Sequence, residues 1–223
     1  MRRFAALCFV VLFVSSAAQA TINYNYVPGP EPRTAQTSLY LNRGNGYYYQ
    51  GKFDLAIADY TKAIELDPRF ALAYNNRGNV YSRIGKRNLA IADYTKAIEL
   101  DPRYVFAYYN RGLTHYENGA YDLAIVDYIK AIKLDPNKAS IYNNLGLAYF
   151  QKGKDDLAIA NYNVAIQLYP GYASAYNNRG LIHYDRGEYA PAKADFETAL
   201  SLNPNVKDSI ACLAMLEKKK HDK

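Results

Sequence analysis

The fold is decided by the stretch DLAIADYTKAIELDP, which runs from Asp54 to Pro68. It returns almost unchanged 34 residues later as NLAIADYTKAIELDP, from Asn88 to Pro102. Apolar side chains in both copies follow one another at intervals of three and four residues, which is the spacing of one face of an α-helix. The proline ends that helix, because the residue before a proline is pushed out of the α-helical region.

The 34-residue step continues from Thr37 to Val206 without an insertion. It divides this part of the chain into five blocks: 37–70, 71–104, 105–138, 139–172 and 173–206. Every block has tyrosine at its fourth position, glycine at its eighth, alanine at its twentieth and twenty-seventh, and proline at its thirty-second. The twenty-fourth position is tyrosine in four blocks and Phe196 in the fifth. This reuse of positions accounts for much of a composition with 24 tyrosines and no tryptophan, and a period of this length is typical of helical repeat proteins.

Each block is predicted to be a helix-turn-helix unit. A glycine at position 15 separates a first helix from the second, which the quoted stretch forms. In four blocks position 18 suits the N-cap of the second helix: Asp54, Asn88, Asp122 and Asp156. The fifth block has Ala190-Pro191 there, and proline fits the first turn of a helix.

Packing between successive blocks is predicted from the small residues. Glycine and alanine at positions 8, 20 and 27 allow two helix backbones to approach closely, and the ring at position 24 fills the space between hairpins. One hairpin cannot bury its apolar face, whereas stacked hairpins form a continuous core in which each contacts only its neighbours. The fold class is therefore all-α, a solenoid of five helix-turn-helix repeats.

The segment 207–223 is predicted to be a capping helix with a basic tail. Val206, Ile210, Leu213 and Ala214 form a one-sided apolar stripe that is expected to cover the last repeat. The polar tail from Glu217 is expected to fray. Cys212 is either a small buried residue or a site of pairing between chains, and burial is the usual state of a free cysteine.

The order of small and large residues resembles the tetratricopeptide repeat. That family has Trp, Leu, Gly and Tyr in its first helix, where this chain has Tyr74-Asn75-Asn76-Arg77-Gly78-Asn79-Val80-Tyr81. The resemblance implies a right-handed superhelix whose concave groove is lined by the first helix of each hairpin and binds extended peptides or partner helices. Residues facing the groove in this family fall near positions 2, 5, 6, 9, 12 and 13.

The main departure from the family pattern is at position 7, where arginine replaces an apolar residue in four blocks: Arg43, Arg77, Arg111 and Arg179. Position 23 is aspartate in these same four blocks, but Asn161 in the block whose position 7 is Leu145. Because the charge disappears from both positions together, we expect an Arg–Asp ion pair between the two helices of one repeat.

Position 6 supplies the candidate binding site, because it is asparagine in every block: Asn42, Asn76, Asn110, Asn144 and Asn178. Core packing gives no evident reason for this amide, whereas a regular row of donors and acceptors can hold a peptide backbone. A similar asparagine ladder lines the repeat domain of the O-linked N-acetylglucosamine transferase family. Further groove candidates are Asn45, Asn75, Asn79, Asn143, Asn177, Tyr48, Tyr109, Tyr116, Phe150 and Tyr184. The alternative is that the asparagines brace local structure.

These features predict a non-enzymatic scaffold whose partner is a protein or peptide. His115 and His183 share position 11 with tyrosines of other blocks, and no metal, cofactor or nucleophile motif is present, so catalytic, metal and cofactor sites are not expected. The formal net charge of +6 is mild and partly lies in Lys218-Lys219-Lys220, which does not indicate a nucleic-acid surface. A cell-wall glycan binder and a self-assembling structural protein remain alternatives, and self-association remains open.

The amino-terminal residues predict export to the periplasm or secretion. Arg2-Arg3 are followed by an apolar run from Phe4 to Val14 and by small residues up to Ala20, after which cleavage is expected. The apolar run is too short for a stable membrane span, since a hydrocarbon core is roughly 30 Å thick. Residues 21–36, rich in proline, are predicted to be an extended linker.

Overall fold

The computed structural model describes residues 35–221, with side chains up to residue 217. The predicted signal peptide of residues 1–20 lies outside the described residues, as does most of the predicted linker 21–36. The end of that linker needs a correction, because Ala35 and Gln36 are already the first residues of a helix.

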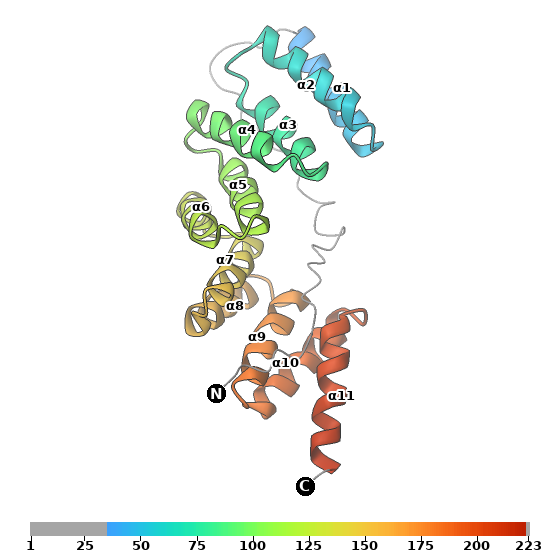
Figure 1. Cartoon of the computed structure of the whole chain (residues 1–223), viewed down its shortest axis with the longest axis vertical. Coiled ribbons are helices and arrows are strands. Elements are labelled where there is room, and N and C mark those ends of the chain that lie inside the picture. The colour runs from blue at the N-terminus through green and yellow to red at the C-terminus, as the bar shows by residue number, and fades with distance from the viewer. Residues whose placement is uncertain (1–34, 222–223) are drawn as a thin grey trace. The chain divides into compact units, whose positions relative to one another are not determined.

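The described residues form eleven α-helices (Figure 1). Ten of them form five hairpins: α1 (Ala35–Tyr49) with α2 (Phe53–Leu66), α3 (Ala71–Arg83) with α4 (Arg87–Leu100), α5 (Val105–Glu117) with α6 (Tyr121–Leu134), α7 (Ala139–Gln151) with α8 (Asp155–Leu168), and α9 (Ala173–Asp185) with α10 (Tyr189–Leu202). We refer to these hairpins as repeats 1 to 5. Helix α11 (Lys207–His221) follows repeat 5. Each even-numbered helix packs against its own odd-numbered helix and against the next one along the chain, which confirms the predicted all-α solenoid.

The turn inside each hairpin depends on a glycine in the left-handed region of backbone conformation. The five glycines at position 15 have φ between 68° and 76°: Gly51, Gly85, Gly119, Gly153 and Gly187. A side chain is strained at such a φ, so glycine is the residue that ends the first helix and starts the turn. The predicted turn position is confirmed.

The predicted N-caps are wrong. The residues before α2, α4, α6 and α8 are Lys52, Lys86, Ala120 and Lys154, and none of them makes a side-chain cap hydrogen bond. Asp54, Asn88, Asp122 and Asp156 are each the second residue of their helix. The carboxylates of the three aspartates therefore lie in the first turn, where a negative charge interacts favourably with the helix dipole. Pro191, as predicted, lies in the first turn of α10.

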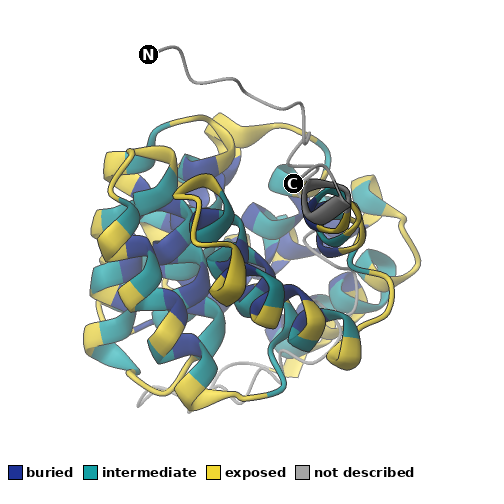
Figure 2. Ribbon diagram, turned by 90° about the horizontal axis from the view of Figure 1, so that it is seen from below, coloured by how far each residue is buried: buried dark blue, intermediate teal, exposed yellow. Residues whose placement is uncertain are grey.

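The core of each repeat is built on a contact between the glycine at position 8 and the aromatic ring at position 24. In repeat 2 a Cβ atom added to Gly78 would lie 2.7 Å from Cε1 of Tyr94, closer than two carbon atoms can approach. The same contact recurs in the other repeats, and these rings are almost fully buried. Figure 2 shows the ribbon coloured by burial, with buried stretches recurring along the helices of the stack. The absence of a side chain at position 8 is therefore what lets the two helices of a hairpin enclose the ring.

Helix α11 covers repeat 5 with a different face from the one expected. Its buried residues are Ser209, Cys212 and Leu216, so the predicted burial of Cys212 is confirmed. Ile210 is 51% exposed and Ala214 is also exposed, which corrects the predicted stripe. The helix also continues to His221, beyond the point at which fraying was expected.

Candidate functional site

The inner surface of the solenoid is formed by the odd-numbered helices. Neighbouring odd-numbered helices contact one another directly from α1 to α9, whereas no comparable contact joins one even-numbered helix to the next. Helices that approach most closely lie on the inner side of a curved stack. The first helix of each hairpin therefore lines that side, as the resemblance to the tetratricopeptide repeat implied.

The five position-6 asparagines occupy equivalent places on these helices but differ in exposure. Asn42, in the first repeat, is exposed, and Asn76 is buried at 5% exposure. Asn110, Asn144 and Asn178 are half-buried. We call these five residues the asparagine row. Three of its members, in repeats 3 to 5, therefore combine a buried side with a side that reaches solvent.

The asparagine row links successive repeats by hydrogen bonds. The Nδ2 group of Asn110 donates to Oδ1 of Asn75 and Oδ1 of Asn79 in the preceding repeat, each over 3.0 Å. The corresponding bonds at the other three interfaces run from Asn76 to Asn45 (3.0 Å), from Asn144 to the hydroxyl of Tyr109 (2.9 Å) and from Asn178 to Asn143 (3.0 Å). At the carboxyl-terminal end the hydroxyl of Ser209 in α11 donates to Asn177 over 2.7 Å.

The premise that packing gives no reason for this amide is therefore wrong. Side chains at position 5 in repeats 2 to 5 accept a hydrogen bond from the next odd-numbered helix, and buried polar groups require such partners. Repeat 1 has Leu41 at position 5, and there Asn45 at position 9 accepts the bond instead. The asparagines brace neighbouring repeats, which was the alternative considered from the sequence.

The structure separates the other groove candidates into two groups. Asn75, Asn143, Asn177 and Tyr116 are buried, and Asn45 and Asn79 accept hydrogen bonds from the hydroxyls of Tyr60 and Tyr94. Burial raises the pKa of the Tyr109 hydroxyl, which bonds Asn144. Tyr48, Phe150 and Tyr184 are half-buried. The parts of the predicted site that reach solvent therefore include the exposed Asn42, the half-buried asparagines of the row and these three rings.

The predicted Arg–Asp pairs are present in all four repeats that carry both residues. In repeat 2, Arg77 Nε and Nη2 each donate to one carboxylate oxygen of Asp93 over 2.8 Å, and Asp93 is 6% exposed. The hydrogen bonds to Asp93 raise the pKa of Arg77. Equivalent two-pronged pairs join Arg43 to Asp59, Arg111 to Asp127 and Arg179 to Asp195. The charge at position 7 is therefore neutralised inside each of these four repeats.

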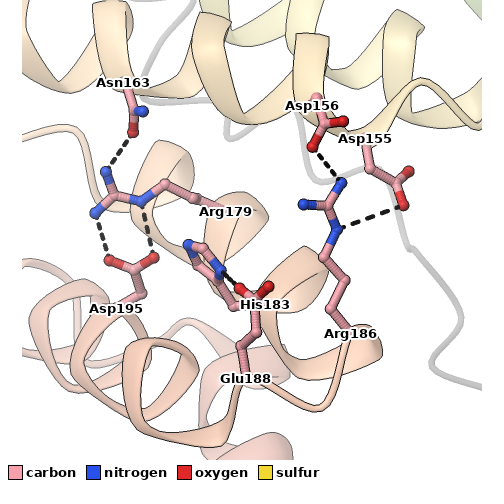
Figure 3. A network of polar contacts seen from close by, with 8 residues as sticks. All are labelled: Asp155, Asp156, Asn163, Arg179, His183, Arg186, Glu188 and Asp195. Atoms are coloured by element: carbon pink, nitrogen blue, oxygen red, sulfur yellow. Dashed lines mark hydrogen bonds and ion pairs between the residues drawn. The ribbon is translucent and has the colours of Figure 1, made fainter.

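The same arginines also reach the preceding repeat, which the sequence did not predict. Nη1 of Arg77 donates to Thr61 and that of Arg111 to Thr95, each over 3.0 Å. Arg179 likewise contacts Asn163, as Figure 3 shows beside the pair with Asp195. All three acceptors lie at position 25, so one guanidinium group joins three helices.

Repeat 4 replaces this arrangement with an apolar contact. Leu145 takes the place of arginine, and the residue at position 25 of the preceding repeat is Ile129 rather than a polar residue. Both belong to one apolar cluster, which also includes Tyr128. Position 25 of repeat 3 therefore loses its polar residue together with the charges at positions 7 and 23 of repeat 4. This joint change in the sequence could have indicated the three-helix contact.

Surface ion pairs add a second link between repeats. Arg186 of repeat 5 contacts Asp156 of repeat 4 over 2.7 Å and lies 4.0 Å from Asp155 (Figure 3). Lys152 contacts Asp122 in the equivalent place one repeat earlier. These pairs are exposed, so each stabilises the stack only slightly.

Family models confirm the resemblance that the repeat pattern suggested. The model described as TPR repeat matches residues 44–85, 114–153 and 146–187, and two models described as tetratricopeptide repeat match residues 71–104 and 173–206 and residues 93–126. The chain belongs to the tetratricopeptide repeat family. Proteins of this family are protein-interaction scaffolds and are generally not enzymes.

Solved structures of other tetratricopeptide repeat proteins share this fold. A crystal structure of MamA is 32% identical, with a TM-score of 0.67, and the match covers 72% of this chain and 94% of MamA. PilF of Pseudomonas aeruginosa is 25% identical, with a TM-score of 0.78 over 86% of this chain and 87% of PilF. YrrB, described as a TPR protein with an unusual peptide-binding site, is 22% identical, with a TM-score of 0.67, over 82% of this chain and all of YrrB; it shows the fold alone. The search of curated proteins gives no significant match.

His115 and His183 of this tetratricopeptide repeat chain lie among structural contacts. His115 has 13% side-chain exposure and lies 3.9 Å from Asp127, and burial lowers its pKa. His183 contacts Glu188 (Figure 3). Within the described residues, no three His, Cys, Asp or Glu side chains gather as a metal site would require. None of the helices from α1 to α11 has the length and apolar character needed to span a bilayer.

Proposed function

We propose that this protein binds an extended peptide along the half-buried part of the asparagine row, and that it does so as a scaffold without catalysis. The observation that carries this proposal is the hydrogen-bonding capacity left on three neighbouring amides. An asparagine amide has two N–H donors and one carbonyl acceptor. Within the described residues, Oδ1 of Asn110, one N–H of Asn144, and both Oδ1 and one N–H of Asn178 have no partner.

These groups match the needs of a peptide backbone. An extended chain presents an N–H and a carbonyl at every residue, and both require partners when they leave water. The inter-repeat bonds fix each amide in one orientation, so binding does not have to order the side chain first. Acceptors and donors at a regular step can therefore hold a backbone without reading its side chains.

Apolar side chains beside the row supply contact area. Position 9 is leucine in repeats 3 to 5, and Leu113, Leu147 and Leu181 are only partly buried. Phe150 and Tyr184 at position 12 are also half-buried. Rings give a large contact area at low entropic cost. The combination favours a peptide that carries occasional apolar side chains.

The test begins with peptides selected from a random displayed library on the wild-type chain. We expect these peptides to bind the variant Asn144→Ala/Asn178→Ala at least about tenfold more weakly, because two hydrogen bonds to the ligand are lost. Binding is measured by titration calorimetry at a temperature at which circular dichroism shows both proteins folded.

The matched control is Asn161→Ala/Asn163→Ala. It also removes two hydrogen-bonded amides, but from the even-numbered helix α8. Selected peptides should bind this control as they bind the wild type. Equal binding to the wild type and to the Asn144→Ala/Asn178→Ala variant, or a loss confined to the control, would show that peptides dock elsewhere.

We also propose that the protein works in the cell envelope after export. The support is the basic, apolar and small-residue order of residues 1–20. Expression of the full chain followed by fractionation and amino-terminal sequencing should find a mature form that begins at Thr21. An uncleaved protein in the cytoplasmic fraction contradicts export without affecting the peptide-binding proposal.

A further inference from the structure

Helix α11 occupies the place of an odd-numbered helix in a sixth hairpin. It packs against α10 as α3 packs against α2. Counted in the same 34-residue frame, its buried residues Ser209, Cys212 and Leu216 fall at positions 3, 6 and 10. Those positions are likewise buried in α3. The helix therefore repeats the inward face of its predecessors.

The opposite face of α11 differs from its counterparts. In α3, Gly78 at position 8 is buried under the ring of Tyr94 from the helix that completes the hairpin. The equivalent residue of α11 is Ala214, which is exposed, and Ile210 at position 4 is 51% exposed. Among residues 35–217, no second helix covers this face.

This open face has an ordered chemical pattern. Lys207, Ile210, Ala214 and Glu217 are spaced by three, four and three residues, which places them on one side of a helix, and all four are exposed. Neither Lys207 nor Glu217 has an ion-pair partner within the described residues. The face thus carries, in order, a positive charge, a large apolar group, a small apolar group and a negative charge.

The pattern is complementary to itself when it is reversed. An antiparallel copy centred on residue 212 places Lys207 against Glu217 and Ile210 against Ala214. By symmetry each contact forms twice, so two pairs of opposite charges and two pairs of a large with a small apolar side chain result. A parallel copy instead brings like charges together, which disfavours pairing. We propose that the face formed by Lys207, Ile210, Ala214 and Glu217 binds the same face of a second copy of this chain, antiparallel and around a two-fold axis.

The contact is small, and this sets the behaviour expected of the dimer. Stable protein interfaces bury on the order of 800 Å² per partner, more than four residues of one helix supply. The dimer should therefore be weak and should form as concentration rises. It does not depend on peptide binding, because the asparagine row lies on other helices.

Sedimentation equilibrium of the full chain tests the proposal. The wild type should show a concentration-dependent monomer–dimer equilibrium, and Ile210→Asp should remain monomeric at the same concentrations because two buried charges would face apolar groups. The matched control is Leu123→Asp on α6, since Leu123 is 54% exposed, close to the value for Ile210. A monomeric wild type, or a dimer that Ile210→Asp leaves intact, overturns the proposal.

Charge exchange tests the antiparallel register without touching the apolar residues. Lys207→Glu alone or Glu217→Lys alone should weaken dimerisation by about tenfold, because each creates two like-charge contacts. The double variant Lys207→Glu/Glu217→Lys should restore wild-type association at low salt. If the double variant does not recover dimerisation, the two helices do not pair antiparallel. This test stays decisive even if Ile210→Asp loses helicity and its sedimentation cannot be interpreted.

Discussion

At the level of single residues, the tyrosine at position 24 shows how one buried hydroxyl depends on a neighbouring amide. The hydroxyls of Tyr60 and Tyr94 donate to Asn45 and Asn79 at position 9, over 2.7 and 2.9 Å. In repeat 3 position 9 is Leu113, and the buried hydroxyl of Tyr128 has no partner. An unpaired buried hydroxyl destabilises the folded state.

This difference predicts opposite effects for one substitution made in two repeats. Tyr94→Phe should lower the free energy of unfolding by roughly 0.5–1.5 kcal/mol, because it removes a hydrogen bond. Tyr128→Phe should raise it by about 1 kcal/mol, because it removes a hydroxyl that lost its water on folding. Urea unfolding followed by circular dichroism measures both. A destabilised Tyr128→Phe variant would mean that this hydroxyl has a partner in solution.

Two glycines in helices provide a second test at this scale. Gly78→Ala should destabilise the protein by roughly 1–3 kcal/mol, because the new Cβ meets the ring of Tyr94 at 2.7 Å. Gly46 lies inside α1 with nothing within 4 Å of its added Cβ, so Gly46→Ala should stabilise by about 0.5–1 kcal/mol. Thermal unfolding distinguishes the two, and equal effects would contradict the close ring contact.

His115 predicts a pH dependence of stability. Burial lowers its pKa below the ordinary value of 6.5, so the unfolded chain binds this proton more readily than the folded protein does. Its contribution to stability is complete above about pH 7 and is lost as the pH falls below about 6.5. The variant His115→Tyr copies Tyr81 and Tyr149 at position 11. As the pH is lowered from about 7 to about 5.5, its free energy of unfolding should fall less than that of the wild type. Identical pH profiles for unfolding would show that the imidazole is not desolvated.

At the level of the helices, the boundaries could be predicted because glycine and proline act locally. A glycine at φ near 70° and an Asp-Pro pair restrict the backbone whatever surrounds them. The N-caps and the buried face of α11 could not be predicted in the same way. Ile210, Leu213 and Ala214 form as good an apolar stripe as Cys212, Leu213 and Leu216, and only the position of repeat 5 decides which is buried.

The Arg–Asp pair of repeat 2 should be replaceable as a set by the residues found at the same positions around repeat 4. Arg77→Leu alone should destabilise repeat 2 because it leaves the buried Asp93 unpaired, and Asp93→Asn alone because it leaves the half-buried Arg77 without its counter-ion. The double variant should recover roughly 1–3 kcal/mol of the summed loss. Adding Thr61→Ile, which copies Ile129, should recover more. Additive single effects in a double-mutant cycle of unfolding free energies would remove the coupling.

At the level of the whole molecule, the bonds between repeats explain why the role of the asparagine row could be predicted only in part. Its recurrence follows from the 34-residue period, and its place on the inner helices is what the resemblance to the tetratricopeptide repeat implied. Its partners do not, because the atoms that meet across an interface depend on how one hairpin is rotated against the next. The stack brings Asn110 between Asn75 and Asn79, which lie 35 and 31 residues earlier.

Because each repeat contacts only its neighbours, loss of one such bond should loosen the molecule locally rather than uniformly. Asn110→Ala removes both of the bonds that Asn110 makes to repeat 2 and leaves the buried Asn75 without this donor, so we expect a loss of roughly 1–3 kcal/mol. Amide hydrogen exchange should rise in α1 to α4 more than in α7 to α10, because the first two repeats then detach more easily from the remaining three. Asn42→Ala is the matched control, since Asn42 is exposed and has no earlier repeat to bond among the described residues, and it should leave exchange unchanged. A uniform rise in exchange across all ten hairpin helices would show that the stack unfolds as one cooperative unit, with the amides contributing only to its total stability.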